Sequence, residues 1–222
     1  MTAAAPGATD QVWGTALGVP YLAWPPAGGQ AAPPVVGWHL IDPPSSDAAL
    51  AAALPMARLP AWRVYLGLPL TGARSLSGGV RDVQRRASVD AIQFMLEPIP
   101  TQAVAKLPWV VRDLRRQLPI DDSPIGLFGG SLGGLTALLG LAEADVPIGA
   151  ATVVNAVIRL TTVLYAYRIS HQLDDRSRAT ARRLDLIERA ADIAARQPQP
   201  PLLLATGDQD APGFLADAAD SH

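Results

Sequence analysis

The sequence predicts an α/β protein in which a mostly parallel sheet is covered by helices on both faces. After an opening hairpin, short apolar runs alternate with helical or turn-rich segments along the 222 residues. Strand–helix repeats of this kind form parallel sheets with helical layers. Hydrophobic residues make up 49% of the chain, enough for a substantial core, and the length fits one domain.

The first third of the chain is expected to hold a hairpin, two further strands and a helix. Apolar residues around a Gly-Val-Pro turn predict a hairpin over residues 12–24. The short apolar runs 35–38 and 62–66 predict buried strands. Between them, Ser45-Ser46-Asp47 is a capping signal ahead of the alanine- and leucine-rich segment 48–59, which is expected to be helical.

Prolines divide the next part of the chain. Residues 80–96 are expected to contain a short helix, and Pro98 and Pro100 are expected to break the helical structure after it. Between residues 104 and 118, valine and leucine recur every three or four positions, which describes one face of a helix. Pro108 is expected either to kink that helix or to mark its true start.

The second half continues the strand–helix alternation. Residues 157–199 are expected to be mostly helical and to include an amphipathic helix that ends near Arg196. The apolar face of that helix is formed by Leu184, Ile187, Ala191 and Ala194. The other expected elements are strands at residues 125–128, 148–154 and 202–205, a helix at residues 132–142 and the start of a helix at residues 214–219.

Composition and charge exclude several classes of function. The net charge is −2, so no general attraction to nucleic acid is expected. No apolar run is long enough to span a bilayer and residues 1–10 lack the pattern of a secretion signal, so a soluble cytoplasmic protein is expected. The absence of cysteine excludes disulfides and thiolate metal sites.

No cofactor and no metal are expected. The chain lacks the phosphate-binding motif G-x-x-x-x-G-K-[ST]. Its three histidines are scattered along the chain and form no metal-ligand pattern.

The most informative motif is Gly129-Gly130-Ser131-Leu132-Gly133-Gly134, which contains G-x-S-x-G centred on Ser131. It stands between an expected strand and an expected helix, where a serine sits on a tight, strained turn with its hydroxyl exposed. Glycines flank the serine because larger neighbours would collide, and the N–H groups that open the helix suit a developing oxyanion. A glycine-rich turn that only lets the strand and helix pack closely is the alternative.

The motif and its setting resemble the α/β-hydrolase superfamily. Gly-Gly-Ser-Leu-Gly-Gly looks most like the elbows of prolyl-oligopeptidase-like hydrolases and related bacterial esterases, and the resemblance covers the chain from residue 12 onward. It implies an eight-stranded, mostly parallel sheet, a catalytic triad in the order Ser, Asp, His, and often a helical cap. It also implies one domain overall, with core segments 1–156 and 200–222 and a helical cap at 157–199.

The resemblance places the triad acid on the turn after the strand at 202–205. The sequence there is Thr206-Gly207-Asp208-Gln209-Asp210, and the family's Gly-x-x-Asp pattern maps onto Gly207 and Asp210. Asp210 is therefore the expected acid and Asp208 the second choice. The acid fixes the histidine tautomer and stabilises the imidazolium. An ordinary polar turn that closes a strand is the alternative.

The resemblance also implies two backbone donors for the oxyanion, the N–H groups of Ile41 and Leu132. Ile41 lies in a loop where relatives carry His-Gly before the donor residue, and here Leu40 replaces that glycine. His39 precedes Ser131 and sits at a strand end, so it is expected to support the loop rather than act as the base.

No histidine of the sequence fits the place of the catalytic base in the triad. His39, His171 and His222 are the only histidines, and His171 falls in the expected cap. Only twelve residues separate Asp210 from His222, too few for the helix, strand and loop that the family places there. The true base is therefore expected beyond residue 222, with the last strand and helix of the fold also missing, and the chain as given is expected to hydrolyse little or nothing.

The expected reaction is hydrolysis of a carboxylic ester through an acyl-enzyme on Ser131. A catalytically silent binding protein, a peptidase and an acyltransferase on the same fold are the alternatives. The expected partner is a small-molecule ester or peptide, with no nucleic acid and no membrane. Apolar residues at 160–167 either line an acyl or leaving-group pocket or only pack the cap onto the core. The arginines at 176–183 form a solvated helix face or attract a carboxylate.

Overall fold

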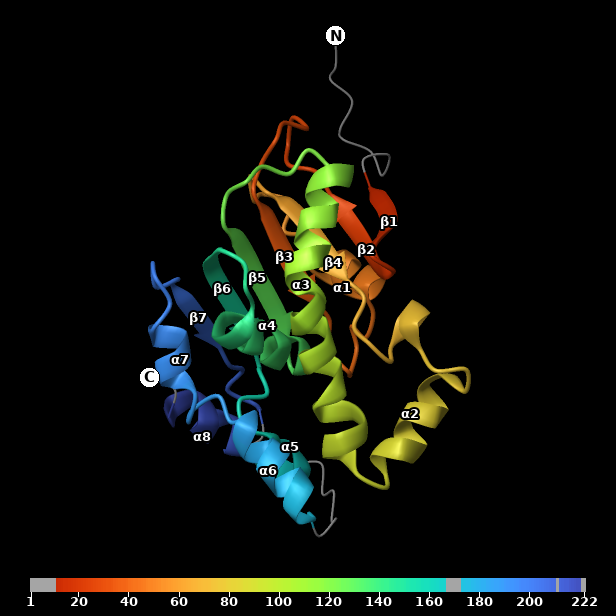
Figure 1. Ribbon diagram of the computed structural model, residues 1–222, viewed down its shortest axis with the longest axis vertical. Helices are drawn as coiled ribbons and strands as arrows, with labels where there is room; N and C mark the ends of the chain where they lie inside the picture. The colour runs from red at the N-terminus through yellow and green to blue at the C-terminus, as the bar shows by residue number, and fades with distance from the viewer. Residues whose placement is uncertain (1–10, 167–172, 211, 221–222) are drawn as a thin grey trace.

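The computed structural model describes residues 11–166, 173–210 and 212–220 and shows an α/β protein built on one sheet (Figure 1). The strands of the described part are β1 (Val12–Ala16), β2 (Val19–Trp24), β3 (Pro34–Trp38), β4 (Trp62–Leu66), β5 (Ile125–Gly130), β6 (Ile148–Val154) and β7 (Leu202–Ala205). They form a seven-stranded sheet in the order β1-β2-β4-β3-β5-β6-β7. β2 runs antiparallel to β1 and β4, and all other neighbours run parallel, so the predicted mostly parallel sheet is confirmed.

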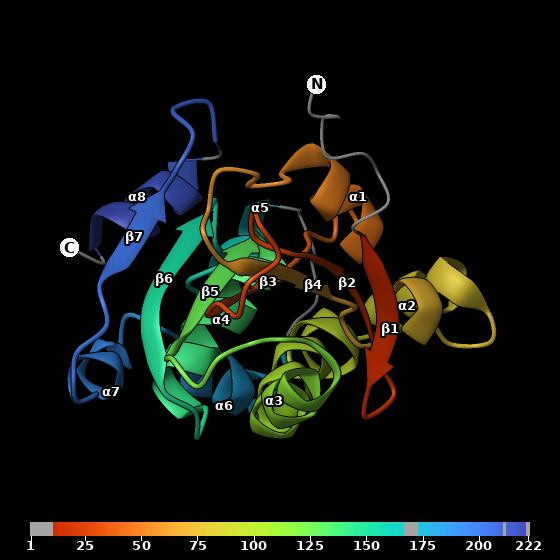
Figure 2. The ribbon, with the colours of Figure 1, turned by 90° about the horizontal axis from the view of Figure 1, so that it is seen from above.

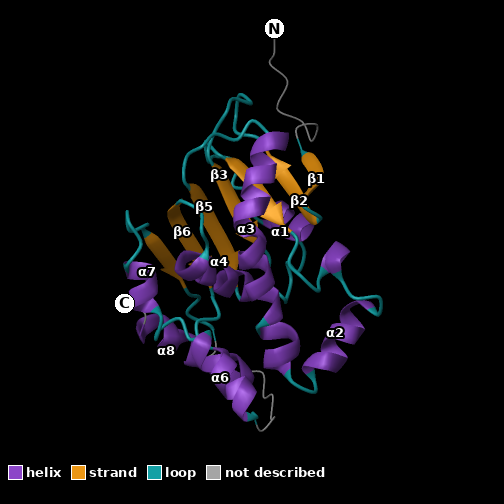
Figure 3. Cartoon of the chain, viewed as in Figure 1, coloured by secondary structure: helices purple, strands orange, loops and turns teal. Residues whose placement is uncertain are grey.

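Helices cover both faces of this sheet, as predicted (Figure 3). The helices of the described part are α1 (Asp47–Ala53), α2 (Gly79–Ala87), α3 (Pro98–Gln117), α4 (Leu132–Glu143), α5 (Leu160–Ala166), α6 (Asp175–Arg183), α7 (Ala190–Ala194) and α8 (Pro212–Asp220), with a 3-10 turn at Gly72–Arg74 and a π-helical turn at Ile92–Leu96. α4 packs on β3, β5 and β6 and contacts α3, whereas α1 packs on β2, β3 and β4 from the other side (Figure 2).

The core lies mainly between the sheet and the layer of α3 and α4. Leu107 of α3, Leu127 of β5 and Leu135 of α4 are almost inaccessible to solvent there. Burial of apolar surface on both sides holds β5 and the segment after it in one position. The smaller cluster, between the sheet and α1, consists of Leu22, Leu50, Ala51, Tyr65 and Phe128.

The parallel strands end along one edge of the sheet. β3, β5, β6 and β7 run in the same direction, so the segments that follow them meet at their carboxyl ends. These segments carry Ile41, Ser131, Asn155 and Asp210 in turn. α5 and α6 lie beyond this edge (Figure 1). Open α/β sheets bind ligands at this edge, which makes it the place to examine for a functional site.

α1 is shorter than the helix predicted at residues 48–59. It begins as expected, because the Oγ of Ser46 accepts a hydrogen bond from the N–H of Ala49 at 3.1 Å. It ends at Ala53 because Pro55 follows, and a proline disfavours helical geometry in the residue before it.

α3 begins at Pro98 and Pro100, the two prolines that were expected to break the helical structure. Pro98 and Pro100 occupy the first turn of the helix, where N–H groups have no intrahelical partner and the fixed φ of proline suits the helix. Pro108 lies inside α3 and does not mark its start. The short helix expected within residues 80–96 is confirmed as α2.

The prediction of one amphipathic helix that ends near Arg196 is wrong. Leu184 ends α6, and the carboxylate of Asp185 accepts hydrogen bonds from the N–H groups of Ile187 at 3.0 Å and Glu188 at 3.3 Å. An aspartate bonded to backbone two or three residues onward forms a turn that competes with a continuous helix. α7 is therefore only a short separate segment.

The other predicted elements are confirmed to within two residues. They are the hairpin at 12–24, the strands at 35–38, 62–66, 125–128, 148–154 and 202–205, and the helix at 132–142. The helix expected to start at 214–219 is α8. The eighth strand that the resemblance implies is not among the described residues. In the described part of the chain, every helix is too short or too polar to cross a membrane.

Candidate active site

Ser131 stands on the turn that leads from β5 into α4. Its backbone has φ 49° and ψ −117°, a conformation that costs a non-glycine residue on the order of 1–3 kcal/mol. Its N–H donates to the carbonyl of Val154 at 3.1 Å, and its carbonyl accepts from the N–H of Val157 at 3.1 Å and of Leu135 at 3.0 Å. The surrounding hydrogen bonds therefore hold Ser131 in this conformation.

The glycines around Ser131 are required by close approach. A Cβ at Gly129 would lie 2.0 Å from the carbonyl oxygen of Gly133, and a Cβ at Gly133 would lie 2.2 Å from that of Trp38. A Cβ at Gly130 would lie 2.7 Å from a side chain of the loop after β3. Close packing accounts for these glycines, but it does not require a serine at φ 49°. That feature favours the nucleophile interpretation over a simple packing turn.

The loop after β3 lies against the turn that carries Ser131. The carbonyl oxygens of Trp38 and His39 approach Gly133, which places the end of β3 beside the start of α4. Among the described residues, neither the N–H of Ile41 nor the N–H of Leu132 has a hydrogen-bond acceptor. Both expected oxyanion donors are therefore free of internal hydrogen bonds in this part of the chain.

His39 is buried at the end of β3, and both of its ring nitrogens are engaged. Nδ1 lies 2.6 Å from the carbonyl oxygen of Leu40, so this nitrogen carries a proton, and Nε2 lies 3.1 Å from Oγ1 of Thr71. Burial lowers the pKa of His39, against smaller opposite effects of the Leu40 carbonyl and the Asp47 carboxylate. An imidazole occupied in this way supports the loop and has no nitrogen left for a serine hydroxyl.

The acidic turn after β7 lies at the same edge of the sheet as Ser131. β7 neighbours β6, and β6 neighbours β5. Two strand spacings amount to about 10 Å, which leaves room for one imidazole. The N–H of Asp210 donates to the carbonyl of Gly207 at 3.1 Å and closes the turn. Asp210 is half-buried whereas Asp208 is exposed, which favours Asp210 as the partner of an imidazole.

Asn155 also lies at the carboxyl edge of the sheet, but it was not predicted as a site residue from the sequence. It follows β6 directly and has φ 45°. Its N–H donates to the carbonyl of Ala205 at 2.8 Å, and its Oδ1 accepts from the N–H of Gly207 at 2.8 Å. The only sequence signal is an asparagine after an apolar strand, since asparagine tolerates positive φ better than most residues. Asn155 connects the end of β6 to the acidic turn.

The histidine of the expected triad is not among the described residues. His171 and His222 lie outside them, and His39 is the only histidine of the described part. The described residues also hold no group of three or more histidine or carboxylate side chains placed to bind a metal ion. The edge thus combines a strained serine, two backbone donors and an acidic turn.

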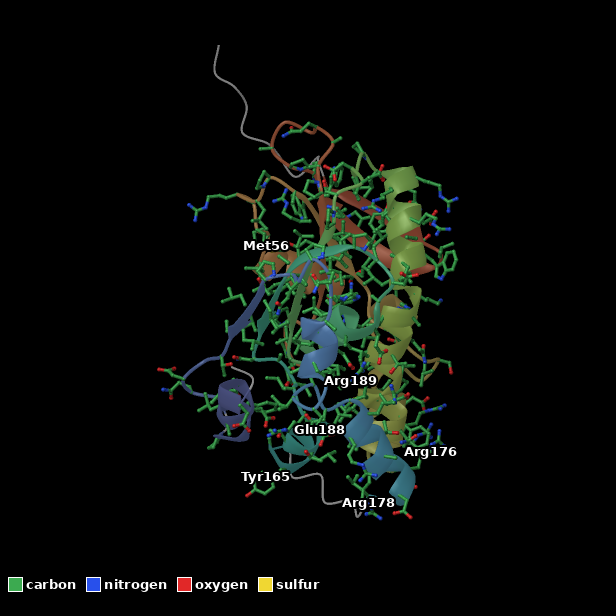
Figure 4. The ribbon with its side chains drawn as sticks, turned by 60° about the vertical axis from the view of Figure 1, so that its left-hand side comes forward. Met56, Tyr165, Arg176, Arg178, Glu188 and Arg189 are labelled. Atoms are coloured by element: carbon green, nitrogen blue, oxygen red, sulfur yellow. The ribbon has the colours of Figure 1, made fainter. Side chains whose placement is uncertain are left out.

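The segment expected to form a cap packs partly into the core. Leu160, Val163 and Leu164 are buried in the main apolar cluster, and α7 packs against α4. Tyr165 is 86% exposed and points away from the rest of the molecule (Figure 4). Tyr167 lies outside the described residues. The three buried side chains therefore serve packing rather than a pocket.

The arginines of α6 form a solvated face. Arg176 and Arg178 extend away from the core (Figure 4). Arg178 pairs with Asp175 at 2.8 Å, one turn away on the exposed surface. Arg183 pairs with Glu97 at 3.0 Å. Because these two arginines already pair with carboxylates of the chain itself, the solvated-face interpretation is favoured over a carboxylate site.

Comparison with solved structures identifies the fold. The chain is similar to acylaminoacyl peptidase of Pyrococcus horikoshii, at 17% identity and TM-score 0.66 over 95% of this chain and 33% of that chain. It is similar to a puromycin-hydrolyzing peptidase of Mycobacterium tuberculosis, at 17% identity and TM-score 0.63 over 95% and 33%. It is also similar to carboxyl esterase 2 of the mycorrhizal fungus Tuber melanosporum, at 15% identity and TM-score 0.53 over 98% and 73%.

The chain therefore has the α/β-hydrolase fold, as the resemblance of the elbow motif implied. It spans about a third of the length of the two peptidases. No family model and no curated protein matches the sequence.

Proposed function

We propose that this chain forms the core of a serine hydrolase in which Ser131 is the nucleophile. The observation that carries the proposal is the backbone of Ser131, held at φ 49° between a buried strand and a helix by hydrogen bonds on both sides. Backbone strain of this kind concentrates at active sites, where it presents a side chain to a substrate. The fold, which is also that of two peptidases and an esterase, supports the proposal.

In the proposed reaction, Oγ of Ser131 bonds to the carbonyl carbon of the substrate while its proton passes to a histidine outside the described residues. The N–H groups of Ile41 and Leu132 donate to the resulting oxyanion, and the positive end of the α4 dipole adds to this stabilisation. The intermediate then breaks its bond to the leaving group, which takes the proton from the imidazolium. Water then gives a proton to the histidine as its oxygen bonds to the acyl carbon. The bond from that carbon to Oγ of Ser131 breaks, Oγ takes the proton back and the carboxylic acid leaves.

Asp210 is the proposed acid of this mechanism. Its carboxylate accepts a hydrogen bond from Nδ1 of the histidine, so that Nε2 faces the serine and the imidazolium is stabilised. The half-buried position of Asp210 supports this choice over the exposed Asp208. The helices α5 and α6, in the segment 157–199, form the proposed cap beyond the carboxyl edge of the sheet.

The proposed substrate is a carboxylic ester with a modest apolar acyl group. The match to the esterase spans 73% of that protein, whereas the match to the peptidases spans a third of each. The match thus accounts for most of the esterase, which supports an ester. A peptide or amide is the second candidate, supported by the names of the two peptidases.

Steady-state turnover by the complete gene product tests this proposal. We expect p-nitrophenyl acetate to be hydrolysed at least about 10-fold more efficiently than an acylaminoacyl p-nitroanilide, and Ser131→Ala to lower turnover by about 1,000-fold or more. Ser123→Ala is the control, because the described hydrogen bonds of Ser123 use only its backbone. Turnover that survives in Ser131→Ala would contradict the proposal, and preference for the anilide would assign peptides as the substrate class.

If the proposed base lies outside these 222 residues, the chain by itself turns over little of either substrate. Turnover by this chain that depends on both Ser131 and His222 would instead assign the base to His222.

A further inference from the structure

The segment 154–157, which begins with the last residue of β6, contacts both halves of the proposed catalytic site. Val154 accepts from the N–H of Ser131 and Val157 donates to the carbonyl of Ser131, each at 3.1 Å. Between these two residues, Asn155 reaches in the other direction to the turn after β7. The segment 154–157 therefore holds the nucleophile on one side and the acidic turn on the other.

Asn155 binds the start of the acidic turn with both its backbone and its side chain. Its N–H donates to Ala205 at 2.8 Å, and its Oδ1 accepts from the N–H of Gly207 at 2.8 Å. A backbone N–H can only donate, so the amide oxygen must face the turn. The carbonyl of Gly207 in turn accepts from the N–H of Asp210 at 3.1 Å. Two hydrogen bonds thus connect the Asn155 side chain to the backbone of Asp210.

The side chain of Asn155 is what distinguishes it from other residues in the same conformation. Leu17 has φ 50° in the hairpin between β1 and β2, and its N–H donates to Asp113 at 3.1 Å without any use of its side chain. Glycine would satisfy the backbone at either position at lower conformational cost. At position 155, however, glycine would leave the N–H of Gly207 without its acceptor.

We propose that Asn155 is a positioning residue, whose side chain fixes the acidic turn 206–210 relative to Ser131. The inference rests on the proposed function. The turn must hold its carboxylate at one distance from the serine for an imidazole to bridge the two. Asn155 acts on the acid through the backbone and does not contact substrate, so its loss affects kcat rather than KM.

Amide hydrogen exchange and ester kinetics of the complete gene product test this role. In Asn155→Gly we expect exchange across residues 204–210 to rise by about 10-fold or more. We expect kcat to fall about 10- to 100-fold and KM to stay within about twofold. Because glycine relieves the positive φ, the thermal midpoint is expected to stay close to that of the parent. Leu17→Gly is the matched control and is expected to match the parent in exchange of residues 204–210 and in kcat.

Hydrogen exchange and ester kinetics together distinguish a failure of the positioning role from a failure of the proposed function. Unchanged exchange in Asn155→Gly would overturn the proposal whatever the activity. Raised exchange with unchanged kcat would also overturn it, because Asn155 would then be only structural. Parent turnover that does not depend on Ser131 would contradict the proposed function first, and the positioning role with it.

Discussion

Ser131 and Asn155 are non-glycine residues at φ 49° and 45°, at the carboxyl ends of neighbouring strands. Each such conformation costs on the order of 1–3 kcal/mol and persists only where surrounding contacts determine it. Hydrogen bonds to the segment 154–157 and to the turn after β7 provide those contacts. The two strained residues therefore fix the positions of a hydroxyl and an acidic turn.

Replacement of Gly129 by alanine is expected to lower the free energy of unfolding by about 3 kcal/mol or more, because the added Cβ would lie 2.0 Å from the carbonyl oxygen of Gly133. Urea unfolding followed by circular dichroism measures this. Gly37→Ala is the control, because Gly37 is buried in β3 but its Cβ would meet only side chains at 3.5 Å or more. Equal losses in the two variants would contradict the close backbone approach at the elbow.

Stability should depend on pH through His39. Burial depresses the pKa of His39 below its ordinary value of 6.5, so the unfolded state binds the proton more readily than the folded state. The contribution of the neutral imidazole to stability is present above pH 6.5 and is lost as the pH falls. His39→Asn keeps a donor for the carbonyl of Leu40 but does not titrate. Its free energy of unfolding should therefore decrease less than that of the parent between about pH 7 and pH 5. Parallel decreases in chemical denaturation would exclude His39 as the cause.

Motifs predict Ser131 and the acidic turn as parts of the site, because the relevant glycines and acids are close in sequence. Asn155 could not be found in this way. Its role depends on a hydrogen bond to Gly207, which lies 52 residues further on. Such a bond exists only after β6 and β7 have paired, and no local pattern encodes it.

The far end of α4, the helix that begins next to Ser131, is capped by one arginine. The guanidinium of Arg196 donates to the carbonyls of Leu141 and Ala144, and to those of Gly140 at 3.4 Å and Val146 at 3.2 Å. The last carbonyls of a helix have no partner within it, so these bonds supply the missing donors. Arg196 thereby stabilises the helix that positions the candidate nucleophile.

Arg196→Met, which keeps much of the aliphatic stem but no donor, is expected to lower the free energy of unfolding by about 2–3 kcal/mol. Arg176→Met on the exposed face of α6 is the control and should change it by less than about 0.5 kcal/mol. Thermal unfolding of both variants measures the difference. A loss no larger in Arg196→Met than in Arg176→Met would contradict the capping role.

Helix boundaries were predicted correctly where periodicity and caps agree, as at Ser46. They failed where one side chain redirects the backbone, as Asp185 does after α6. They also failed at Pro98 and Pro100, because a proline breaks a helix interior but suits a first turn. Whether a proline breaks a helix or begins one depends on where the helix starts, and periodicity alone does not reveal that start.

β7 lies at one end of the described sheet and exposes apolar surface. Leu203 of β7 is 59% exposed, and Val154 at the end of the neighbouring β6 is 37% exposed. Side chains alternate along a strand, so the neighbouring Leu204 points to the other face, where it lines a cavity of about 500 Å³ with Leu138 and Ile193. Exposed apolar surface on an edge strand favours association with other chains.

In the 222-residue chain, Leu203→Lys is therefore expected to reduce self-association in light scattering while changing the free energy of unfolding by less than about 0.5 kcal/mol. Leu204→Lys, one position further on, brings a charge toward the cavity and should cost about 1–3 kcal/mol. Equal stability losses in the two variants would contradict the assignment of the two faces.

The parallel sheet with helices on both faces was predictable, because strand–helix repeats have few other solutions. The order of the strands was not predictable from local patterns. β3 lies between β4 and β5, and the pairing of β3 with β5 joins segments that are far apart in the sequence. That pairing puts the loop with Ile41 beside Ser131, so the candidate site is a product of the whole sheet.

Labelling of the complete gene product with a fluorophosphonate, followed by peptide mass spectrometry, locates the nucleophile. We expect one phosphonylated residue, Ser131, with the adduct lost in Ser131→Ala and retained in Ser123→Ala. An adduct on a different residue, or none on the folded protein, would contradict the assignment of Ser131.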